Sequence, residues 1–125
     1  MSAITTASRI ETAQGAAGNY RDLLIRLMTR QIYAETATAE VFGKALSAAP
    51  NWKEKALAAE FAAEEARHSQ GLYDLLVDLG EDPEAIIAER PDASEFWQID
   101  LDNWLHIAVF NFTVDRAGSH QIMEN

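Results

Sequence analysis

The sequence predicts an all-α protein, built as an antiparallel bundle of long helices. Two stretches, 19–48 and 52–79, repeat apolar residues at the three- and four-residue spacing of a helix with one buried face. The break between them, Ala49-Pro50-Asn51, ends the first helix and can cap the second. Because this connection is short, we expect the two helices to be antiparallel neighbours. The 125 residues suffice for one small domain with one core.

The remaining elements follow from their boundary residues. Residues 1–18 are rich in Ser, Thr, Ala and Gly and predict a flexible N-terminal arm, whereas 19–125 predicts a helical domain. Asn19 is a candidate N-cap for the first helix. Gly80 is suited to the C′ position that ends the second. Two more helices are predicted, a short one over 84–90 and a third long one over 94–122 that begins near Ser94.

Composition narrows the classes of function. The net charge of −10 argues against nucleic acid and against an anionic membrane as partners. The absence of cysteine excludes disulfides, thiolate zinc sites and cysteine nucleophiles, and leaves histidine and carboxylate as metal ligands. No apolar run approaches the ~20 residues of a membrane-spanning helix, and the N-terminal residues lack the apolar segment of a signal peptide. We therefore expect a cytoplasmic protein.

Two residue types that bind metals lie three residues apart in the second helix, as Glu65-x-x-His68. Residues at this spacing share a helix face, and Phe61 and Leu72 belong to the same face. A carboxylate and an imidazole thus stand where leucines are expected, and a buried carboxylate needs a strong partner. Glu-x-x-His directed into a helical bundle is typical of ferritin-like di-iron carboxylate proteins. The spacing alone, however, is common by chance.

The first helix supplies a second carboxylate at the same height. Glu35 and Glu65 each lie about fifteen residues, or ~22 Å, from the connection at Pro50. Two level carboxylates on facing helices repel each other unless a cation or a shared proton lies between them. Glu35, Glu65 and His68 are therefore predicted metal ligands. Carboxylate oxygens with one imidazole per metal favour iron or manganese over zinc.

Other polar residues are weaker candidates. Asp115 falls on the inward line of the third helix, either as a further metal ligand or as an acceptor for an N–H or a cation. His106 and His120 have no helical partner at ligand spacing, which favours structural roles. Arg26 and Arg30 form a basic i,i+4 pair, for which a solvated face is favoured over contact with an acidic partner or a CoA phosphate.

Residues 20–80 resemble the phenylacetate-catabolism oxygenase family, which includes the catalytic subunit of phenylacetyl-CoA epoxidase. Residues 104–118 look like the start of that family's third helix, where an acidic residue faces the metals. The resemblance implies a ferritin-like bundle with a di-iron centre that activates dioxygen and oxygenates an aromatic CoA thioester. It also implies a reductase and a paired oxygenase subunit as partners. The matching segments are Tyr33-Ala34-Glu35, Ala49-Pro50, Lys55, Glu64-Glu65-Ala66-Arg67-His68 and Leu79-Gly80.

The family has a second Glu-x-x-His on a fourth helix, which these residues do not include. We therefore expect either a longer protein or ligands supplied by another chain. A two-fold dimer would bring together two copies of Glu35, Glu65 and His68, giving four carboxylates and two imidazoles. The third helix is also apolar on most sides, which leaves more apolar surface than one chain can bury. We therefore expect a homodimer or larger assembly, whether the protein is longer or the missing ligands come from another chain.

Three functions remain open from the sequence. The first is a di-iron monooxygenase of the epoxidase type. The second is a ferritin-like iron-binding or ferroxidase protein, with a site shared across a symmetric dimer and no organic substrate. The third is a non-catalytic helical partner subunit, against which the retention of Glu35, Glu65 and His68 argues.

Overall fold

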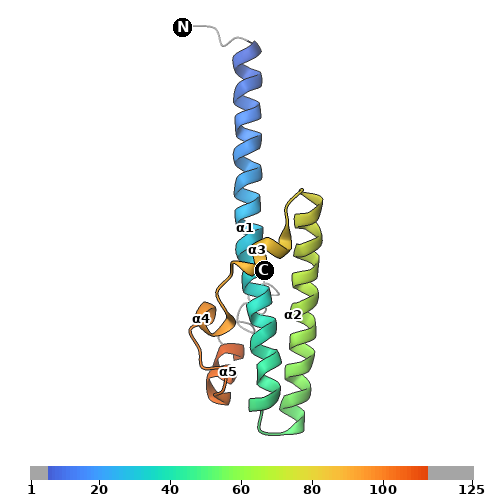
Figure 1. Cartoon of the computed structure of the whole chain (residues 1–125), viewed down its shortest axis with the longest axis vertical. Helices are drawn as coiled ribbons and strands as arrows, with labels where there is room; N and C mark the ends of the chain where they lie inside the picture. The colour runs from blue at the N-terminus through green and yellow to red at the C-terminus, as the bar shows by residue number, and fades with distance from the viewer. Residues whose placement is uncertain (1–5, 113–125) are drawn as a thin grey trace.

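The computed structural model describes the backbone of residues 6–112 and the side chains of 18–112. All regular structure in this range is helical, as predicted. Two long helices, α1 (Thr6–Ala48) and α2 (Trp52–Asp78), run antiparallel, and α1 continues well beyond the end of α2 (Figure 1). Two short helices, α4 and α5, pack against α1 on a different side from α2. The short helices are α3 (Pro83–Ala88), α4 (Ala93–Trp97) and α5 (Trp104–Phe110).

The connection between α1 and α2 has the predicted capping chemistry. Asn51 precedes α2, and its side-chain oxygen accepts a hydrogen bond from the backbone N–H of Glu54 at 2.9 Å. Lys55 donates from Nζ to the carbonyl of Leu46 at 2.5 Å, and thereby satisfies a carbonyl in the last turn of α1. These contacts fix the reversal from which both long helices extend.

The other end of α2 closes at Gly80, as predicted. Gly80 has a φ of +83°, which glycine adopts without steric cost. The N–H groups of Gly80 and Glu81 donate to the carbonyls of Val77 and Leu76, which is the Schellman arrangement. Arg21 of α1 reaches this turn and donates to the carbonyl of Leu79 at 2.6 Å. The hairpin is therefore tied at both ends of α2.

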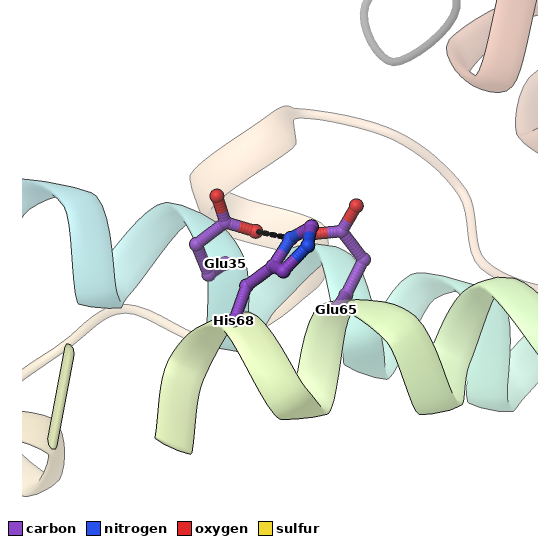
Figure 2. Close-up of side chains that lie close together, drawn as sticks. All are labelled: Glu35, Glu65 and His68. Carbon is purple, nitrogen blue, oxygen red and sulfur yellow. Dashed lines mark ion pairs between the residues drawn. The ribbon is translucent and has the colours of Figure 1, made fainter. Parts of the chain in front are cut away.

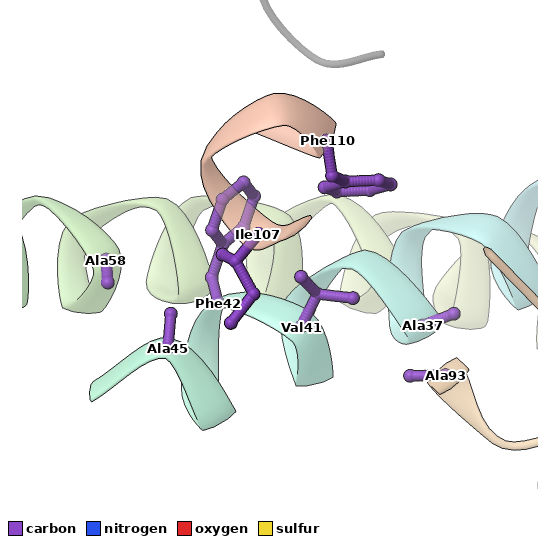
Figure 3. Packing of buried hydrophobic residues seen from close by; sticks show 8 residues of the cluster. All are labelled: Ala37, Val41, Phe42, Ala45, Ala58, Ala93, Ile107 and Phe110. Atoms are coloured by element: carbon purple, nitrogen blue, oxygen red, sulfur yellow. The ribbon is translucent and has the colours of Figure 1, made fainter. Parts of the chain in front are cut away.

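The core consists of two apolar clusters at different heights along α1. The lower cluster lies where α5 and α4 meet the first two helices, and Figure 3 shows Ile107 and Phe110 of α5 over Phe42 and Val41 of α1. The upper cluster is centred on Met28, Ile32 and Leu76, with α3 packed against it. Glu35 and Glu65 fall between these two clusters along their helices. Buried residues of the lower cluster are Ala37, Val41, Phe42, Ala45, Ala58, Ala93, Ile107 and Phe110.

The N-terminal segment differs from the prediction. Residues 6–18 are helical and continuous with α1, so a flexible arm over 1–18 is wrong for these residues. Asn19 consequently lies inside the helix and does not cap it. Gly15 and Gly18 each lower helix propensity by about 1 kcal/mol relative to alanine. No proline interrupts this stretch, so the helix can continue through the glycines.

The prediction of a third long helix over 94–122 is also wrong for the described residues of that range. It is replaced by α4, a turn over 98–103 and α5, so the described chain contains two long helices rather than three. Gln98 adopts a left-handed conformation with φ 54° and ends α4. Asn103 then caps α5 by accepting from the N–H of His106 at 3.3 Å. Aspartate and asparagine side chains that bond to nearby backbone groups compete with a continuous helix.

Candidate metal centre

Glu35, Glu65 and His68 are brought together as the sequence predicts. The Nδ1 atom of His68 lies 3.5 Å from Oε2 of Glu35 and 3.5 Å from Oε2 of Glu65. Figure 2 shows the imidazole between the two carboxylates, one from each long helix. One ligand atom from each residue can be chosen so that all three lie within 4.8 Å of one another. This group can hold a metal ion.

The two helices fix this geometry through their common origin at the connection. Glu65 and His68 are one turn apart on α2, and Glu35 faces them from α1 because both carboxylates lie at the same distance from the reversal. The register is secured beside the site by a hydrogen bond between the hydroxyls of Thr36 and Ser69, 3.2 Å apart. A slip of one residue would turn a side chain by about 100° away from its partner.

The site is buried on one side and open on the other. Glu65 retains 8% of its surface, and the Glu35 side chain is 18% exposed. The His68 side chain is 51% exposed, so the imidazole lies between the buried carboxylates and solvent. A cation can reach the carboxylates from the side of His68 without crossing the apolar core.

The distances from the imidazole of His68 to the two carboxylates suit a shared metal ion. Two ligand atoms that each lie about 2.0–2.2 Å from one metal ion are about 3.0–3.5 Å apart when adjacent in its coordination shell. The separation of Nδ1 from each carboxylate oxygen, 3.5 Å, matches that spacing. The same positions also allow a protonated imidazole to pair with both carboxylates.

Gln31 belongs to the site and was not predicted from sequence. Its Nε2 donates to Oε1 of Glu35 at 2.8 Å, while Oε2 of the same carboxylate faces His68. Ligand carboxylates are commonly oriented by such hydrogen bonds. The available signal was that Gln31 lies four residues before Glu35, at the spacing of helical side-chain pairs.

The other predicted candidates lie outside the centre. Asp115 and His120 are beyond the described residues, so their predicted roles stay untested. His106 is structural as predicted, because its Nδ1 accepts from the backbone N–H of Asp100 at 3.3 Å. Glu64, which adjoins Glu65, is exposed to solvent.

Thr38 is a second polar residue on the inner side of α1, but it does not join the group. It is buried, and its hydroxyl donates to the carbonyl of Ala34 at 2.7 Å. This local bond satisfies the hydroxyl within the helix. Of the three polar residues near the middle of α1, Glu35 is thus a predicted ligand, Gln31 orients that ligand, and Thr38 is hydrogen-bonded within its own helix.

Comparison with known proteins identifies no relative, since no protein-family model, curated protein or solved structure matches the chain. No helix among the described residues is both long and apolar enough to cross a lipid bilayer. Function must therefore be inferred from the centre itself.

Proposed function

We propose that this protein binds iron at Glu35, Glu65 and His68, and that two copies share a centre where dioxygen oxidises Fe²⁺. The observation that carries the proposal is the convergence of two carboxylates and one imidazole within 4.8 Å. Oxygen ligands with one imidazole suit iron or manganese. The half-exposed imidazole gives the ion a direct path to the buried carboxylates.

A second copy completes the ligand set. Di-iron sites in helical bundles use four carboxylates and two histidines, which is twice what this chain brings together. In such a dimer, the α1–α2 hairpins of the two copies make up a four-helix bundle. The face of α2 that carries His68 also carries Leu75, which is 53% exposed. Leu75 lies two turns after His68, so apolar surface adjoins the open side of the centre and favours docking of an identical hairpin.

The reaction balances without an additional reductant. Two Fe²⁺ ions give up two electrons, and one O₂ takes up these electrons and two protons to form H₂O₂. Iron supplies the redox chemistry, and the protein's contribution is to hold two ions close together and to balance their charge with carboxylates. The half-exposed His68 marks the side from which ions and protons are exchanged with solvent.

Oxygenation of a small apolar substrate is the second candidate, as the resemblance to the phenylacetate-catabolism oxygenases suggests. A cavity of about 90 Å³ between α1, α2 and α5 favours it. Phe61 contributes to its wall and lies one turn before Glu65, so the cavity is near the proposed centre. This chemistry needs two electrons from a reductase, because one oxygen atom enters the substrate and the other becomes water.

Anaerobic titration with Fe²⁺ tests the metal centre. Two iron ions per dimer are expected for the wild-type protein, and Glu65→Gln should abolish this binding because the amide lacks the anionic ligand. Glu64→Gln is the matched control, since it removes the same charge from the neighbouring, exposed position. If Glu65→Gln still bound two iron ions per dimer, the proposal would be contradicted.

Oxygen consumption separates the two chemistries. One O₂ consumed per two Fe²⁺, with release of H₂O₂, supports iron oxidation. An oxygenated organic product that requires added reductant, with no net oxidation of free Fe²⁺, would favour the oxygenase instead.

A further inference from the structure

A second candidate site lies in a groove between α1 and α4, where the volume is about 770 Å³. Its α1 wall carries Arg26, Arg30 and Tyr33, and its α4 wall carries Phe96 and Trp97. Tyr33 and Arg26 are two and nine residues from Glu35, which places them on the opposite side of α1 at about 100° per residue. The groove is therefore separate from the metal centre.

The basic side chains of the groove are left without ion-pair partners among the described residues. Arg21 pairs with Glu81, and Arg90 pairs with Glu40, but Arg26 and Arg30 form no ion pair within the part of the chain that the structure describes. Both are exposed, as the sequence predicted. On a chain of net charge −10, two adjacent guanidinium groups without carboxylate partners form a local site for an anion.

The facing wall offers aromatic surface and an unused donor. The rings of Phe96 and Trp97 are 4.9 Å apart in an edge-to-face arrangement. The indole Nε1 of Trp97 is buried and has no hydrogen-bond acceptor among the described residues. Buried N–H donors normally have a partner. A planar ring that enters the groove can pack against these aromatic side chains.

We propose that this groove binds a phosphate monoester of a planar aromatic compound. The phosphate lies between Arg26 and Arg30, and the ring packs against Phe96 and Trp97. A phosphate monoester carries a charge of about −1.5 to −2 at pH 7. Two guanidinium groups balance this charge, whereas a single carboxylate would balance only one of them. The inference does not depend on the function proposed for the metal centre.

Calorimetric titration with adenosine 5′-monophosphate, adenosine and inorganic phosphate tests this site. The monophosphate should bind at least tenfold more tightly than either part alone, because only it occupies both walls. Arg26→Gln/Arg30→Gln should weaken this binding at least tenfold. Lys44→Gln/Lys53→Gln is the matched control, since it removes two exposed positive charges elsewhere and should change the affinity less than twofold.

A third variant tests the aromatic wall. Trp97→Phe keeps a ring but reduces the aromatic surface of this wall, and it should weaken binding of the monophosphate about threefold while leaving phosphate binding unchanged. The proposal is overturned if the monophosphate shows no saturable binding at millimolar concentration. It is equally overturned if inorganic phosphate binds as tightly, or if both double variants lose affinity to the same extent.

Discussion

At the scale of single residues, the hydrogen bond from Gln31 to Glu35 decides which carboxylate oxygen faces His68. Gln31 is itself exposed, so its contribution is to orientation rather than to packing. Hydrogen bonds to metal ligands restrict the rotation of those ligands and hence raise metal affinity. A similar i,i+4 pair occurs on another face of α2, where Gln70 donates to Asp74 at 2.9 Å.

Gln31→Ala should therefore lower iron affinity about tenfold without loss of helicity. Gln70→Ala removes an equivalent bond on α2 and should leave the affinity unchanged. Anaerobic titration of both variants measures the difference. Equal affinities for the two variants would mean that Glu35 does not need this orientation.

Sequence reasoning found the three ligands because helical spacing and distance from the connection depend only on numbering. It was less successful with the buried apolar residues. Leu27 and Leu46 of α1 are 57% and 41% exposed, whereas Ile32 and Val41 are fully buried. The reason is that α1 packs against α2 on one side and against α4 and α5 on another. A single predicted stripe cannot describe a helix that is covered from two directions.

At the scale of elements, the caps of α4 and α5 explain why the predicted third long helix is absent from the described residues. Asp92, rather than Ser94, begins α4, and its carboxylate accepts from the N–H of Glu95 at 3.0 Å. The Ser94 hydroxyl donates to the same carboxylate at 2.5 Å. The hydrogen bond from Ser94, followed by that from the Glu95 N–H, lowers the pKa of Asp92 below its ordinary value of 3.8.

Ser94→Ala should raise the pKa of Asp92 towards 3.8, because it removes the largest cause of the shift. A carboxyl whose pKa is lowered by folding contributes stability above its unfolded pKa, and this stability is lost as the pH falls through the folded value. In the variant, α4 should lose this contribution at a higher pH than in the wild type. NMR titration of the Asp92 carboxyl carbon measures the shift, with Ser47→Ala as an exposed control. An unchanged Asp92 titration in Ser94→Ala would contradict this cause.

At the scale of the whole molecule, the hairpin presents a face that is charged at its centre and apolar beyond it. His68 lies at the open side of the centre, with Leu75 exposed two turns further along α2. Exposed apolar surface beside a polar site is a common property of protein interfaces. The proposed dimer and the proposed iron centre therefore depend on the same surface.

Leu75→Glu should accordingly convert the dimer to monomer and lower iron affinity at least tenfold, because each monomer supplies only half of the ligands. Leu105→Glu places the same charge at a 67% exposed position on α5 and should change neither property. Analytical ultracentrifugation with and without Fe²⁺ measures both effects. A dimer that persists in Leu75→Glu, with full iron binding, would show that a different face is used.

The connection at Ala49, Pro50 and Asn51 has a consequence for how the centre tolerates change in length. Glu35 and Glu65 are separated from the connection by the same number of residues. Inserting seven residues into each helix near the connection would therefore lengthen the hairpin and leave the carboxylates facing each other. Inserting one residue in only one helix would rotate a ligand by about 100° and shift it by about 1.5 Å. The centre is thus robust to paired changes in length and sensitive to unpaired ones, which makes it portable between hairpins of different height.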